Sequence, residues 1–152
     1  KSLLHGQPGR GRTSAANYPP RELARARLMV ALGDCGLTAA EMQVANDILE
    51  RPPSTLCETP DWARSAGYVV LPAGLDCVIR GADAGEDWQL KLRFTVRADG
   101  TRRVVAWLEI QPKAQSAESD ASALDLLTGE THVGTLSVPA TALVAPLLDH
   151  LR

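Results

Sequence analysis

A stretch of ten residues in which apolar and polar side chains alternate decides the fold class of this chain: Trp88-Gln89-Leu90-Lys91-Leu92-Arg93-Phe94-Thr95-Val96-Arg97. Successive side chains of a β-strand point to opposite faces of a sheet, so the apolar residues of this stretch would share one face. The other face would carry polar and cationic side chains. The pattern predicts a strand of an antiparallel sheet that buries one of its two faces.

The residues on both sides of this stretch extend the sheet. Residues 98–101 (Ala-Asp-Gly-Thr) contain the Asp-Gly signal of a hairpin turn, and residues 103–110 are predicted to form the partner strand. Three further apolar runs are predicted to be strands, at residues 68–71, 75–79 and 131–138. Residues 111–123 are polar and are expected to form a loop, and the leucine spacing of residues 139–151 predicts a closing amphipathic helix.

The first fifty residues predict two short helices that follow a loop. Pro19 and Pro20 suit the entrance of the first helix, because amide groups there have no partner in any case. Apolar residues then recur at helical spacing up to about residue 33, and Gly36 is placed to end the helix. Thr38, with Glu41 three residues later, forms the pattern of a capping box at the start of the second helix.

These elements place the chain in the α+β class. Residues 1–50 are expected to form a short helical segment of winged-helix type, and the proline-rich residues 51–64 a linker. Residues 65–152 are expected to form an antiparallel β-rich α+β domain with a C-terminal helix.

The charge of the chain is unevenly distributed. The formal net charge of the 152 residues is -2, yet residues 1–35 hold six lysines and arginines against one glutamate and one aspartate. A local basic patch is the electrostatic footprint of nucleic-acid binding, even on a protein that is acidic as a whole. The alternative is an ordinary solvated face on which basic residues cluster by chance.

Other classes of function find little support in the sequence. The three cysteines, at positions 35, 57 and 77, share no short spacing, which argues against a disulfide framework and a zinc site. No motif of a nucleophile with its base and no phosphate-binding loop is present. No apolar run reaches the roughly 18 residues of a membrane span, and the start shows no signal-peptide pattern. We therefore expect a cytoplasmic protein that is not an enzyme and uses neither metal nor cofactor.

Residues 12–42 resemble part of the MerR-like winged-helix DNA-binding family. The resemblance lies in the order of Tyr18, the apolar positions from Leu23 to Leu32, the turn glycine Gly36, and the helix start at residues 37–42. It covers the wing of that family and the helices that follow the wing. The recognition helix that would come before the wing is not found in residues 1–9.

The resemblance implies contacts with the phosphate backbone of double-stranded DNA, which position a protein without reading the base sequence. The wing and the start of the first helix would supply seven contacting residues: Arg10, Arg12, Thr13, Ser14, Tyr18, Arg21 and Arg25.

Two functions therefore remain open at the level of sequence. The first is a DNA-binding transcriptional regulator or architectural protein, whose β-rich domain forms a homo-oligomer or senses an effector. The alternative is a non-enzymatic protein-interaction module, an adaptor or anti-regulator, that works through the β-rich domain.

Overall fold

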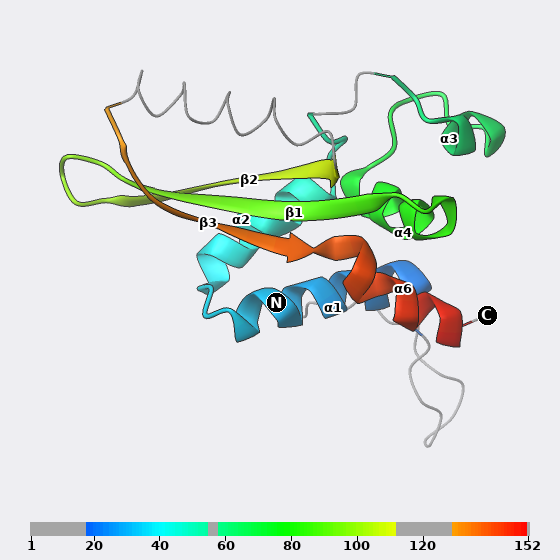
Figure 1. Cartoon of the computed structure of the whole chain (residues 1–152), viewed down its shortest axis with the longest axis horizontal. Helices are drawn as coiled ribbons and strands as arrows, with labels where there is room; N and C mark the ends of the chain where they lie inside the picture. The colour runs from blue at the N-terminus through cyan, green and yellow to red at the C-terminus, as the bar shows by residue number, and fades with distance from the viewer. Residues whose placement is uncertain (1–17, 55–57, 112–128, 152) are drawn as a thin grey trace.

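The computed structural model describes residues 18–54, 58–111 and 129–151. In these ranges the chain forms α1 (Pro20–Asp34), α2 (Ala39–Leu49), α3 (Asp61–Ser65), α4 (Gly74–Ala84), β1 (Asp87–Val96), β2 (Arg102–Gln111), β3 (Thr131–Pro139) and α6 (Ala140–His150). This mixture of helices with one antiparallel sheet confirms the predicted α+β class (Figure 1).

The sheet has three strands in the order β2-β1-β3, so the stretch that predicted the fold forms the central strand. β1 pairs antiparallel with β2 from Asp87↔Gln111 to Val96↔Arg102, and the predicted hairpin is confirmed. In its turn, the backbone N–H of Thr101 donates to the Asp99 carboxylate at 2.8 Å, and Gly100 adopts a φ of 82°. β1 also pairs antiparallel with β3, which confirms the strand predicted at residues 131–138.

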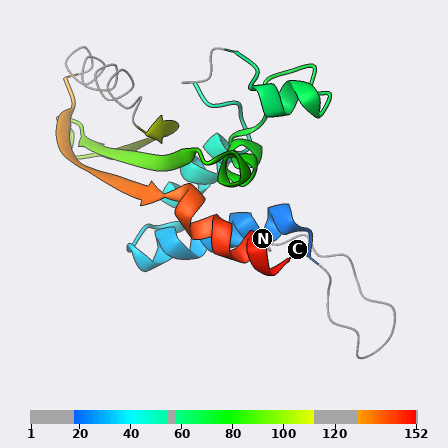
Figure 2. The same ribbon diagram turned by 45° about the vertical axis from the view of Figure 1, so that its right-hand side comes forward.

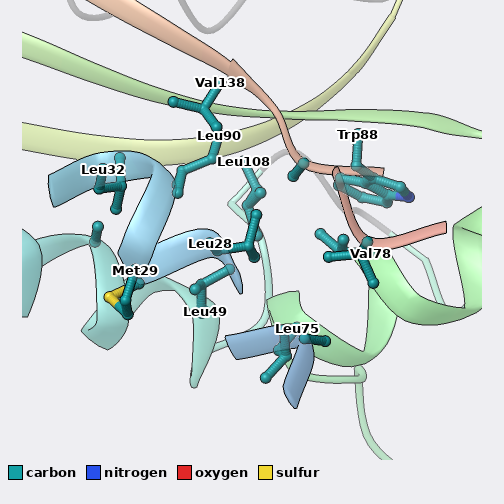
Figure 3. Packing of buried hydrophobic residues seen from close by; sticks show 14 of the residues in the cluster. Leu28, Met29, Leu32, Leu49, Leu75, Val78, Trp88, Leu90, Leu108 and Val138 are labelled. Carbon is teal, nitrogen blue, oxygen red and sulfur yellow. The ribbon is translucent and has the colours of Figure 1, made fainter. Parts of the chain in front are cut away.

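Four helices cover one face of the sheet and enclose the core. In Figures 1 and 2, α1 and α6 lie side by side below the strands, α2 lies against β2, and α4 lies beside the start of β1. Trp88 and Leu90 of β1, Leu108 of β2 and Val138 of β3 point from the sheet into this layer (Figure 3). The core also contains Leu28 from α1 and further residues from α2, so it spans both sides of residues 51–64.

The two N-terminal helices follow their predicted signals. Pro20 is the first residue of α1, and Gly36 takes a φ of 81° just beyond its end. The capping box of α2 is confirmed: the Thr38 hydroxyl accepts from the Glu41 N–H, and the Glu41 carboxylate accepts from the Thr38 N–H at 2.8 Å. Glu41 also pairs with Arg102 of β2 at 3.1 Å, so the same carboxylate ties α2 to the sheet.

Two of the predicted strands are wrong. Residues 75–79 lie in helix α4, and residues 68–71 lie outside all strands. A short apolar run does not distinguish a strand from a buried helix turn. Here Leu75 and Val78, three residues apart, face the core together, which is the spacing of a helix. Residues 61–65, within the predicted linker, form α3.

The second face of the sheet carries the predicted cations, and two of them are buried. Lys91 and Arg93 of β1 are buried, and Lys91 forms an ion pair with the buried Glu109 of β2. The indole N–H of Trp107 donates to the same carboxylate at 3.0 Å. The charge of Lys91 is therefore neutralised within the sheet.

Glu130, just before β3, forms ion pairs with two arginines near the hairpin end of this face. Its carboxylate accepts from the Thr95 hydroxyl at 2.7 Å, and it pairs with Arg97 at 3.0 Å and Arg103 at 3.2 Å. The hydrogen bond from Thr95 has the largest effect on the pKa of Glu130. Together with the hydrogen bonds and the positive charge of the two arginines, it lowers this pKa to about 2.

No helix in the described ranges is both long enough and apolar enough to cross a membrane.

We expect the stability of the protein to fall in acid because of Glu130. Its pKa lies well below the ordinary value of 4.5, so the carboxylate stabilises the fold above about pH 4.5 and loses this contribution as the pH falls towards 2. In urea titrations, Glu130→Gln should lower the free energy of unfolding at pH 7. The variant should also show a smaller fall in that free energy between pH 5 and pH 2. An unchanged pH profile would contradict this role.

We expect Gly81→Ala in α4 to destabilise the protein by about 1–3 kcal/mol, the usual range for overpacking a core. A Cβ at this position would lie 2.5 Å from Cδ1 of Trp88 and would displace the indole from its buried site. Gly33→Ala in α1 is the matched control, because the nearest atom to its Cβ would be the Met42 sulfur at 3.9 Å. The control should be neutral or slightly stabilising in thermal and urea unfolding.

Candidate functional site

The two helix arginines predicted to contact phosphate are held by carboxylates of the same chain. Nη2 of Arg21 lies 2.9 Å from Glu50 at the end of α2, and its Nε lies 3.2 Å from Asp76 in the first turn of α4. Nη2 of Arg25 lies 2.6 Å from Glu22 and 3.3 Å from Glu50. Glu50 thus bridges both arginines, and the cluster joins three helices.

The surroundings favour these ion pairs over an external anion. Burial acts to lower the pKa of Arg21, but the hydrogen bonds and charges of Glu50 and Asp76 outweigh it and hold that pKa above its ordinary value. The Arg25 side chain is 14% exposed. A phosphate that bound here would have to displace these carboxylates and would meet their negative charge.

Four of the other five predicted DNA contacts fall outside the part of the chain that the structure describes. Arg10, Arg12, Thr13 and Ser14 lie outside the described residues, and Tyr18 stands half-buried just before α1. Contact with DNA through residues 10–14 and Tyr18 stays a prediction from the sequence.

The described cysteines differ in accessibility. Cys77 is buried in α4, where desolvation and then the charges of Asp76 and Glu86 raise the pKa of its thiol to about 12. Its thiolate is therefore scarce at neutral pH, and the side chain acts as a small core residue. Cys35 is exposed after α1. Within residues 18–54, 58–111 and 129–151, no three His, Cys, Asp or Glu side chains are grouped to hold a metal ion.

A cleft of about 520 Å³ opens where α3 meets the end of α4, the start of β1 and the end of β2. Helix α3 stands apart from the layer formed by α1 and α6 (Figures 1 and 2). The residues that give the cleft its character are two tryptophans, three carboxylates and one arginine: Trp62, Trp88, Glu58, Asp61, Glu86 and Arg64.

The two tryptophans of the cleft differ in their hydrogen bonds. The indole N–H of Trp88 donates to the Glu86 carboxylate at 2.8 Å. The indole nitrogen of Trp62 is buried, and no acceptor for it exists among the described residues. The ring of Trp62 instead meets Tyr68 edge to face, with 5.8 Å between the ring centroids. A buried donor without an acceptor costs free energy.

The chain leaves α3 through three apolar residues, Tyr68, Val69 and Val70, which we call the apolar segment. All three are exposed, and the exposed fractions of Val69 and Val70 are 96% and 72%. The sequence predicted a strand at residues 68–71, because apolar residues with high β-propensity follow one another there.

Comparison with known proteins yields no relative from which a function can be carried over. No protein-family model matches the chain, and no curated protein or solved structure matches it. The candidate site is therefore defined by geometry alone: the apolar segment and the acidic, tryptophan-lined cleft beside it.

We expect Glu50→Gln to destabilise the protein by about 1 kcal/mol, since it removes the carboxylate shared by Arg21 and Arg25 at a partly exposed position. Asp47→Asn is the matched control, because this exposed carboxylate of α2 accepts from Gln43 of the same helix. The control should change the free energy of unfolding by less than half as much in urea titrations. Equal effects of the two substitutions would show that the cluster does not hold the helices together.

Proposed function

We propose that this protein is a non-enzymatic interaction module that binds a partner protein through the apolar segment. The observation that carries this proposal is the exposure of Val69 and Val70, at 96% and 72%. Complete burial of a valine side chain contributes roughly 1.5–3 kcal/mol, so covering both by a partner would contribute several kcal/mol to binding.

The arrangement around the segment supports an interface over a chance exposure. Single exposed apolar residues are common on protein surfaces, but contiguous ones mark interaction sites. Here three consecutive apolar side chains continue through the Tyr68–Trp62 ring contact into a cleft. Tyrosine and tryptophan are the residue types that most often dominate binding energy at interfaces.

The backbone of the segment also supports binding of an extended peptide. The N–H of Tyr68 donates to the Ala63 carbonyl at 3.0 Å, and the N–H of Gly74 donates to the Arg51 carbonyl at 2.8 Å. Between these two anchors, Val69 and Val70 take part in no backbone–backbone hydrogen bond with another described residue. In the proposed complex these N–H and C=O groups would pair with a partner strand, as in peptide recognition by strand addition.

We propose an interaction module and not a DNA-binding protein because the arginines of α1 that would contact DNA are paired with carboxylates of the same chain. Arg21 and Arg25, the two α1 residues of the predicted DNA contact, are engaged with Glu22, Glu50 and Asp76. The valine side chains of the apolar segment, in contrast, are exposed.

Selection from a library of random linear peptides, displayed on phage, tests the proposed function. We expect enriched peptides to bind the wild-type chain and to lose at least tenfold in affinity towards the double variant Val69→Ser, Val70→Ser. The matched control is the double variant Val30→Ser, Val133→Ser, which changes two exposed valines on α1 and β3. It should bind the peptides as the wild type does, and fluorescence anisotropy measures all three.

The proposal is wrong if no peptide is enriched, or if both double variants bind equally well. Binding of the wild-type chain to a random DNA duplex, weakened by salt and lost on replacing Arg10 and Arg12, would favour the DNA-binding hypothesis in that case.

A further inference from the structure

We infer that the outer edge of β3 pairs antiparallel with the same strand of a second copy of this chain, which makes the protein a symmetric dimer. Among the described residues, β3 pairs with β1 on one side and with no strand on the other (Figures 1 and 2). Such an edge strand presents backbone N–H and C=O groups that can pair with another chain. The apolar segment takes no part in this contact, so the inference does not rest on the proposed function.

β3 lacks the charged side chains that usually prevent pairing at an edge. Edge strands of monomeric proteins are commonly protected by charged residues, above all by lysine. Residues 131–139 contain no lysine, arginine, aspartate or glutamate, whereas β1 and β2 each contain acidic and basic residues. Thr131, Val133, Thr135 and Ser137 are among the exposed residues of β3. The edge can therefore take a second strand without burying a carboxylate, an ammonium or a guanidinium group of β3.

Two interruptions limit this pairing to residues 134–138. The register of β3 against β1 shifts at Phe94/Thr95, and Val133 has no partner on β1 at this point. A bulge of this kind interrupts regular pairing. At the other end of β3, Pro139 has no backbone N–H to donate. A second copy would therefore pair along the regular run between these two interruptions.

The sequence of this run matches itself in an antiparallel register centred on Leu136. Thr135 of each copy then lies opposite Ser137 of the other copy, and the two Leu136 residues lie opposite each other. On β1, the partners of Thr135 and Ser137 belong to the second face of the sheet, and the partner of Leu136, Leu92, belongs to the core. Opposite residues of antiparallel strands point to the same face, so hydroxyl meets hydroxyl and leucine meets leucine.

The hydroxyl groups of the run can satisfy one another across the contact. The Ser137 hydroxyl donates to the Gln89 side chain at 3.2 Å, and its oxygen can still accept a hydrogen bond. The Thr135 hydroxyl oxygen lies 3.2 Å from Nε2 of His132. When His132 donates in that contact, the Thr135 O–H is the donor to Ser137 of the second copy. The self-pairing thus leaves the hydroxyl groups on the second face with partners.

This pairing closes at two copies. A two-fold contact uses the same surface of both copies, so the dimer has no further β3 edge for a third chain. The opposite edge strand of the sheet, β2, carries Arg102, Arg103 and Glu109, and α2 lies against it. We therefore expect a dimer and no larger assembly.

Sedimentation equilibrium of the wild-type chain, from about 5 µM to about 500 µM, tests the dimer. A reducing agent excludes a disulfide through the exposed Cys35. We expect the average mass to rise with concentration from that of the monomer towards twice that value, because a contact of this size is weak and reversible. The Val69→Ser, Val70→Ser variant should dimerise as the wild type does.

Two double variants at the same positions test the register. Thr135→Lys, Ser137→Lys places like charges opposite each other and should raise the dissociation constant by about tenfold or more. Thr135→Lys, Ser137→Glu places opposite charges across the two-fold and should dimerise at least as tightly as the wild type. An equal mixture of the first variant with Thr135→Glu, Ser137→Glu should restore the dimer, which requires that both chains are folded.

The inference is overturned if the wild-type chain stays monomeric throughout the concentration range, if it grows beyond a dimer, or if Thr135→Lys, Ser137→Lys dimerises as the wild type does. Failure of the mixture to dimerise, or of Thr135→Lys, Ser137→Glu, would also overturn it. Loss of the dimer in the Val69→Ser, Val70→Ser variant would place the contact on the apolar segment instead. The peptide selection is read out separately, so either proposal can fail while the other stands.

Discussion

The pairing of β1 on both of its edges is the constraint on which the rest of the structure depends. Because β1 lies between β2 and β3, its alternation fixes which face of the whole sheet is apolar. Leu90 stands opposite Leu108 on one side and Val138 on the other, so the three strands present one continuous apolar surface. The helices gather on that surface because burial of apolar area drives the packing.

Ion pairs connect the helices to one another and engage basic side chains that the sequence had suggested for binding. Several arginines in the described part of the chain form ion pairs within the fold: Arg21 and Arg25 with carboxylates between helices, and Arg97 and Arg103 with Glu130. Partly buried ion pairs of this kind fix geometry more than they add stability, since desolvation offsets much of the attraction. A basic stretch of sequence is therefore a weak guide to a basic surface when acidic residues lie within reach in the fold.

The candidate site arises where the regular layers end. Trp88 is packed against Gly81 in the core and turns its indole N–H towards Glu86 at the cleft. The same side chain thus supports the junction of α4 with β1 and forms part of the cleft wall. Helix α3 and the apolar segment lie beyond this junction, away from the helix layer (Figure 1). The exposed apolar segment thus lies outside the core, to which Trp88 belongs.

The sequence by itself determined the elements whose signals are local. The alternation of residues 88–97, the Asp99-Gly100 turn and the Thr38–Glu41 capping box each act over a few residues, and all are found in the structure. Only the tertiary structure decided that residues 75–79 are helical, since an apolar run of five residues satisfies either period. Tertiary structure alone also placed Glu50 between Arg21 and Arg25, and Trp62 beside Tyr68 at the cleft. The physical reason is the same in each case: burial and ion pairing join residues far apart in the chain, and no local pattern records which of them will meet.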